Sequence, residues 1–179
     1  MNSSFNNTVT SLAAAPNGQL FAGGRFTMNN AVPVNYIAVW NGATWQQRFP
    51  ANAPAARYHG TMAWDPSRGA TVMYGGQSNT TGYLDTWTWD GTTWTQLPLA
   101  STPTTLGQLA FDYSRGVLSL YLDRPSLGPS ELWDLLATGW VRVNATAPDV
   151  GQLVYDPAIG ALALFASSGR ANFLSLIHI

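Results

Sequence analysis

The segment Val39-Trp40-Asn41-Gly42-Ala43-Thr44-Trp45 recurs further along the chain as Thr88-Trp89-Asp90-Gly91-Thr92-Thr93-Trp94. Each copy places an Asn-Gly or Asp-Gly pair between two tryptophans, and both tryptophans return after 49 positions. A weaker third copy ends at Trp140, 46 positions after Trp94. A recurrence at this period indicates that the 179-residue chain consists of repeated structural units.

A turn signal recurs in step with the tryptophans. Trp64-Asp65-Pro66-Ser67-Arg68-Gly69 returns as Phe111-Asp112-Tyr113-Ser114-Arg115-Gly116 and as Tyr155-Asp156-Pro157-Ala158-Ile159-Gly160, and Ala15-Pro16-Asn17-Gly18 is a shortened relative. Asp and Pro favour the start of a turn, and the final Gly adopts a positive φ without a Cβ clash. We expect a tight hairpin connection at each of these positions.

Short apolar runs lie behind the turns and predict β-strands. In the second copy we expect four strands, at about residues 59–64, 70–74, 84–89 and 93–97. Residues 134–137 are the best local helix candidate, but they occupy the place of an Asp-Gly turn in the other copies, so we interpret them as a degraded connection. The sequence therefore predicts an all-β fold.

Four short antiparallel strands in a unit of about 45 to 50 residues are typical of a propeller blade. We expect a single, incomplete β-propeller domain of four-stranded antiparallel blades over residues 1–179, with about three and a half blades. The boundaries are about 8–50, 54–98, 104–145 and, for a partial fourth blade, 149–179. We expect the natural protein to be longer, and the last six or so residues to be either non-native or an edge strand.

The second copy resembles a Kelch repeat, as found in Kelch-type propellers such as the central domain of galactose oxidases. It carries the opening Arg57-Tyr58-His59, the double glycine Gly75-Gly76 after an apolar run, and the aromatic order that ends at Trp94. The third and fourth copies lack the double glycine and the Arg and His. The resemblance assigns structural roles to Gly23, Gly24, Trp40, Trp45, Arg57, His59, Gly75, Gly76, Trp87, Trp89, Trp94, Trp133 and Trp140.

The composition excludes several classes of function. Charged residues make up 9% of the chain, the net charge is −1 and all eight basic residues are arginines, so nucleic-acid binding is not expected. The absence of cysteine excludes disulfides, thiolate metal sites and a Cys nucleophile. No apolar run approaches the roughly twenty residues of a membrane span, so we expect no membrane insertion.

Residues for catalysis are sparse. The chain has two histidines, His59 and His178, and no G-x-S-x-G motif. We expect His59 to hydrogen-bond backbone. The turn residues Asp65, Asp112 and Asp156 are distributed one per repeat, as capping side chains are, so we expect no metal site and no cofactor. The copper chemistry of galactose oxidases needs a Cys crosslinked to a Tyr, which this chain lacks.

The leading hypothesis is a non-catalytic binding or scaffold propeller that presents loops for protein or carbohydrate recognition. The segments 25–35, 77–83 and 123–130 differ most between copies, and we expect any binding surface to include Arg25, Tyr83 or Arg124. The alternative is the scaffold part of a larger oxidase- or glycosidase-like propeller enzyme whose catalytic residues lie outside this chain. Sequons at Asn6, Asn79 and Asn144 favour an extracellular or secreted setting.

Overall fold

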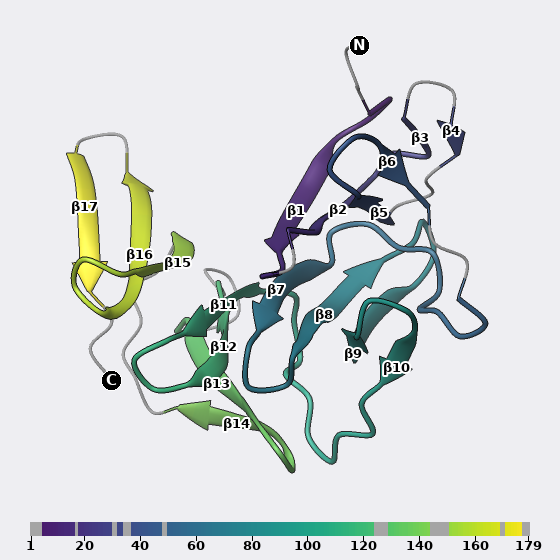
Figure 1. The fold of residues 1–179 in the computed structure, drawn as a ribbon. Helices are drawn as coiled ribbons and strands as arrows, with labels where there is room; N and C mark the ends of the chain where they lie inside the picture. Colours follow the sequence, from purple (N-terminus) through teal and green to yellow (C-terminus); the bar gives the residue numbers. More distant parts are fainter. Residues whose placement is uncertain are drawn as a thin grey trace. The chain divides into compact units, whose positions relative to one another are not determined.

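The computed structural model describes residues 5–16, 18–29, 32–33, 37–47, 50–123, 129–143, 151–168 and 171–176. All regular elements in these ranges are β-strands, and none is a helix (Figure 1). The chain divides into two compact units, Met1–Pro98 and Leu99–Ile179, here called unit 1 and unit 2. The division falls between the second and third sequence repeats.

Unit 1 contains two four-stranded antiparallel sheets, each built from strands in chain order. The first sheet consists of β1 (Val9–Ala14), β2 (Leu20–Gly24), β5 (Ile37–Trp40) and β6 (Trp45–Gln46). A separate short hairpin, β3 (Met28–Asn29) and β4 (Val32–Pro33), lies between β2 and β5 in the chain. The second sheet consists of β7 (Thr61–Asp65), β8 (Ala70–Gln77), β9 (Gly82–Trp89) and β10 (Trp94–Gln96).

Unit 2 repeats this arrangement. Its first sheet consists of β11 (Gln108–Asp112), β12 (Val117–Leu122), β13 (Glu131–Leu136) and β14 (Gly139–Val143), again antiparallel and in chain order. The second sheet has three described strands, β15 (Gln152–Asp156), β16 (Ala161–Ser168) and β17 (Ala171–Leu176).

The all-β prediction is confirmed, and the four strands expected in the second copy are present to within three residues at each end. The interpretation of residues 134–137 as a connection is wrong. Asp134 lies inside β13, opposite Ser119 of β12, and the turn to β14 comes at residues 137–138. Asp134 resembled a turn residue in the sequence, but it is a buried strand residue whose carboxylate is paired with Arg115, 19 positions earlier in the chain.

The predicted hairpin turns are confirmed. Gly69, Gly116 and Gly160 have φ angles of 60°, 66° and 63°, which favour glycine. The Oδ1 atom of Asp65 accepts hydrogen bonds from the backbone N–H of Ser67 at 2.9 Å and from the Ser67 hydroxyl at 2.5 Å. The side chain of the initial Asp therefore closes the turn that the glycine makes sterically possible.

The two sheets of unit 1 pack on each other. Their shared core consists of Ala13, Ala15, Phe21 and Val39 from the first repeat and Met62, Met73, Trp87, Trp89 and Trp94 from the second. Strands β1 and β7, the first of each sheet, contact each other. The tryptophans of the second repeat thus stabilise the stack by burial of large apolar surfaces.

Unit 2 has a corresponding core. Ala110, Tyr121 and Leu132 of its first sheet pack with Leu153, Leu162 and Leu164 of its second, and the first strands β11 and β15 contact each other. Trp140 of β14 is 1% exposed. In the part of the chain that the structure describes, no helix is long and apolar enough to cross a membrane.

Candidate functional site

Arg57 is the most buried of the described arginines of unit 1, with a side chain only 2% exposed. Its guanidinium forms a two-point ion pair with Asp85, in which one pair of atoms is Nη2 and Oδ2 at 3.1 Å. Arg57 also donates from Nε to the carbonyl of Ala55 at 2.9 Å and from Nη1 to the carbonyl of Gly75 at 3.2 Å. These bonds connect the segment before β7 to strands β8 and β9.

Two aromatic residues contact this ion pair, one at each partner. The guanidinium of Arg57 lies 4.1 Å from the ring centroid of Tyr83, and the indole N–H of Trp87 donates to Asp85 Oδ2 at 2.8 Å. Burial alone would raise the pKa of Asp85, but hydrogen bonds from Arg57 and Trp87 and the Arg57 charge outweigh it and lower this pKa. Burial, followed by the charge of Asp85, raises the pKa of the Tyr74 hydroxyl.

A polar and aromatic cluster lies next to this ion pair; we call Arg25, Tyr58, His59, Gln77 and Tyr83 the loop-end surface. The guanidinium of Arg25 lies 4.5 Å from the Tyr58 ring centroid, and the Tyr58 and His59 rings meet edge to face at 4.9 Å. His59 is exposed and has a φ of 60°, which is uncommon for a residue with a Cβ. Such backbone strain is concentrated at functional sites.

The structure places two of the three predicted binding residues around Arg57 and Tyr58. Arg25 contacts Tyr58, while Tyr83 contacts Arg57. Tyr83 lies in strand β9 and not in a loop as expected, because β8 and β9 continue pairing through Gly76 and Tyr83. Arg124 lies outside the described residues. The expected backbone partner of His59 was wrong: His59 Nδ1 lies 3.4 Å from Gln77 Nε2.

The double glycines allow close approach, as expected. A Cβ on Gly24 would lie 2.1 Å from the Thr8 carbonyl oxygen, and one on Gly76 would lie 3.0 Å from Arg57 Cδ. Gly76 also has a φ of 115°. Glycine at this position therefore gives Arg57 the space it occupies beneath the loop-end surface.

We expect Gly76→Ala to lower the free energy of unfolding by about 2 kcal/mol, because the new Cβ meets both a disfavoured φ and the Arg57 side chain. Urea denaturation would measure the loss. Gly82→Ala is the matched control, since a Cβ on Gly82 meets no atom within 4 Å, and it should change stability by less than about 0.5 kcal/mol. Equal losses in both variants would contradict this account of Gly76.

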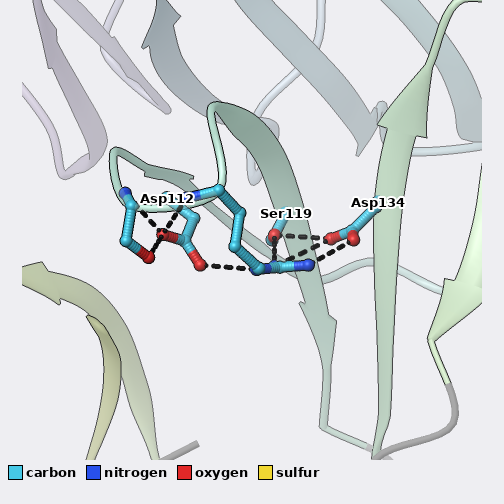
Figure 2. A network of polar contacts seen from close by, with 5 residues as sticks. Asp112, Ser119 and Asp134 are labelled. Atoms are coloured by element: carbon cyan, nitrogen blue, oxygen red, sulfur yellow. Dashed lines mark hydrogen bonds and ion pairs between the residues drawn. The ribbon is translucent and has the colours of Figure 1, made fainter. Parts of the chain in front are cut away.

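Unit 2 contains a second ion-pair network, shown in Figure 2. Arg115 donates to Asp112 Oδ2 at 2.7 Å and forms a two-point pair with Asp134 at 2.6 and 3.2 Å. The Ser119 hydroxyl donates to Asp134 Oδ1 at 2.6 Å and accepts from Arg115 Nη2 at 3.0 Å. Ser119 is fully buried, and Asp112 and Asp134 are also buried.

This network joins a hairpin turn to the middle of a sheet. Hydrogen bonds from Ser114 and Arg115 outweigh burial, which acts in the opposite direction, and lower the pKa of Asp112. Bonds to Asp134 and Asp112 likewise outweigh burial and raise the pKa of Arg115. No histidine takes part, and every side chain in the network is satisfied by another, so this arrangement is suited to holding the fold and not to nucleophilic chemistry.

A carboxylate–indole pair recurs in both units and was missed in the sequence. Trp133 donates its indole N–H to Glu131 at 2.8 Å, as Trp87 donates to Asp85, and the two residues are two positions apart in each case. Arg142 of β14 lies 3.4 Å from Glu131, whereas Asp85 is paired by Arg57 from the segment before β7. The signal in the sequence was an acidic residue two positions before Trp87 and two positions before Trp133.

Cavities lie between the two sheets in the described part of unit 1, and two of them have volumes above 200 Å³. One, of about 270 Å³, is lined mainly by apolar residues with Arg57 and Gln47 in its wall. The other, of about 240 Å³, is lined by aromatic residues and by residues of the hairpin turns. Within the described residues, no group of three or more His, Cys, Asp or Glu side chains converges as a metal site would require.

No family model matches the chain, and no curated protein sequence matches it. The arrangement of side chains is therefore the basis for a functional assignment. Two ion-pair networks stiffen the sheets, and the loop-end surface carries exposed charged and aromatic groups on a rigid base.

Proposed function

We propose that the chain forms part of a Kelch-type β-propeller and acts as a non-catalytic recognition module. Each complete sheet is a four-stranded meander in chain order, as a blade is. Contact between first strands, β1 with β7 and β11 with β15, also supports this proposal, because a radial arrangement brings one edge strand of each blade together.

The ligand we propose is an acidic segment of a partner protein, bound at the loop-end surface. The exposed Arg25 contacts the face of Tyr58, and no described carboxylate forms a salt bridge with it. A guanidinium in this state retains its donors for an incoming carboxylate. This positioning of Arg25 over Tyr58, beside the strained His59, is the observation that carries the proposal.

A rigid base supports recognition at this surface. The backbones of Tyr58 and Gln77 are joined by two hydrogen bonds. The Tyr58 N–H donates to the Gln77 carbonyl at 2.9 Å, and the Gln77 N–H donates to the Tyr58 carbonyl at 2.8 Å. The hydroxyl of Tyr58 donates to the Ser78 carbonyl at 3.3 Å. Binding to such a surface loses little conformational entropy, which favours affinity.

The test is selection of ligands from a random peptide library displayed on phage, followed by measurement of affinity. We expect enrichment of Asp and Glu in the selected peptides. Arg25→Ala should weaken their binding about tenfold, since a paired guanidinium is worth about 1.5–3 kcal/mol. Binding should also weaken as salt is raised, because the charges are exposed.

Arg142→Ala is the matched control, because it removes one positive charge from an exposed position in unit 2. It should leave peptide affinity unchanged. Selected peptides without acidic residues, or equal losses in the two arginine variants, would contradict recognition at the loop-end surface.

A further inference from the structure

The cavity of about 240 Å³ in unit 1 lies between the two sheets beside their hairpin turns. Its wall includes the rings of Phe21, Trp64 and Trp89, together with Thr71 and Asp90. Pockets that hold drug-sized ligands span roughly 300–1,000 Å³, so this cavity suits a smaller group. None of these residues belongs to the loop-end surface.

Three polar atoms of the residues that line this cavity have no hydrogen-bond partner. They are the indole N–H groups of Trp64 and Trp89 and the hydroxyl of Thr71, all shielded from solvent. Trp89 is 2% exposed and Thr71 is fully buried. Buried polar groups are nearly always paired in native proteins, so three unpaired atoms among the residues that line one cavity favour an occupant toward which these side chains turn.

We propose that this cavity binds a single neutral sugar ring, as a monosaccharide or as one residue of a glycan. Aromatic faces pack against the apolar C–H surface of a pyranose, and the two indole donors require acceptors, which sugar hydroxyl and ring oxygens provide. The Thr71 hydroxyl both donates and accepts. In the proposed complex the two indoles and the Thr71 side chain rotate, so that these three atoms, which are covered in the unliganded structure, face the ligand.

The charge of the residues that line the cavity and their hydrogen-bond donors limit the class of ligand that fits. Backbone N–H groups of Thr93 and Thr92 donate to Asp90 Oδ1 at 2.8 Å and lower the pKa of this carboxyl, which is therefore ionised. None of the wall residues described is a Lys, Arg or His, so an anionic ligand is disfavoured. A quaternary ammonium would suit the rings and Asp90 but would leave both indole donors unpaired.

The experiment titrates the intact chain with methyl glycosides of glucose, galactose, mannose and N-acetylglucosamine, and follows tryptophan fluorescence and indole N–H resonances. We expect at least one glycoside to give saturable binding below about 50 mM, in the weak range of a single small ring. The Trp64 and Trp89 indole N–H signals should shift on saturation. Choline, titrated in parallel, should give no saturable shift.

Thr71→Val tests how the unpaired hydroxyl affects stability without ligand and affinity for the ligand. Without ligand, this variant should raise the midpoint of thermal unfolding, because it removes an unpaired buried hydroxyl at constant shape. Its affinity for the bound glycoside should fall about fivefold or more, and Trp64→Phe, which retains an aromatic ring, should weaken binding similarly. Trp40→Phe is the matched control, since Trp40 does not line the cavity.

Two outcomes would overturn the proposal. One is the absence of saturable binding by any of the four glycosides, with Thr71→Val destabilising the protein, which indicates that ordered water satisfies the hydroxyl. The other is glycoside binding that Trp64→Phe and Thr71→Val leave unchanged. Arg25 does not line the cavity, so the effect of Arg25→Ala on peptide binding tests the loop-end surface alone. The proposal of a sugar site can therefore fail while the proposal of peptide recognition holds, and the reverse.

Discussion

Asp134→Ala should lower the free energy of unfolding by about 3–5 kcal/mol, the usual cost of removing one partner from a buried ion pair. The variant leaves the Arg115 guanidinium with Asp112 alone and removes the acceptor of the buried Ser119 hydroxyl. Urea denaturation followed by tryptophan fluorescence measures the loss. The effect should be large because Asp134 accepts hydrogen bonds from Arg115 and from Ser119, each at 2.6 Å.

Two further variants test whether the loss comes from the unpaired charge. In Arg115→Leu/Ser119→Ala/Asp134→Leu every member of the network except Asp112 is apolar, and we expect a smaller loss than in Asp134→Ala. In that variant Asp112 still accepts the backbone and hydroxyl hydrogen bonds of Ser114. Asp156→Ala removes a turn carboxylate in the same unit that accepts from Ala158, and should cost about 1 kcal/mol. A similar cost for Asp134→Ala would refute a strong network.

Arg57→Ala should have an effect of comparable size, about 3–5 kcal/mol of unfolding free energy. It leaves the Asp85 carboxylate without its cation, and it leaves the carbonyls of Ala55 and Gly75 without this donor. Arg57→Lys should recover little of the loss, because an ammonium group cannot reproduce the planar two-point pair or its stacking on Tyr83. Full recovery by lysine would show that charge alone matters.

The pH dependence of stability provides an independent check on this ion pair. The pKa of Asp85 is lowered in the folded state, so its contribution is present above the unfolded value of about 4 and is lost as pH falls through the folded pKa. The stability difference between wild type and Asp85→Asn should therefore be largest near neutral pH and should shrink below about pH 4. A difference independent of pH would mean that the charge on Asp85 contributes little.

The repeat made the strands and turns predictable, because both depend on neighbouring residues. The Asp-to-Gly turn signals are local, and Gly69, Gly116 and Gly160 adopt the positive φ expected of them. Asp134 shows the limit of this reasoning. Its pairing with Arg115 joins residues 19 positions apart, so a local pattern assigned a buried strand residue to a connection.

The candidate sites were only partly predictable, for the same reason. Arg25 and Tyr83 were selected because their segments differ between repeats, but their contacts with Tyr58 and Arg57 depend on how the sheets fold. The orphan indoles of Trp64 and Trp89 could not be inferred at all. Every tryptophan carries the same N–H donor, and only the packed structure determines whether an acceptor lies within reach.

The order of residues alone was sufficient to establish the all-β class, the repeated hairpins and the exclusion of thiol chemistry, since these follow from local conformational preference and composition. Three-dimensional packing decided which charges were paired, which glycines faced a neighbour and where a cavity remained between the sheets. The physical reason is range: a turn is determined over about four residues, whereas an ion pair or a cavity depends on side chains brought together by the whole sheet.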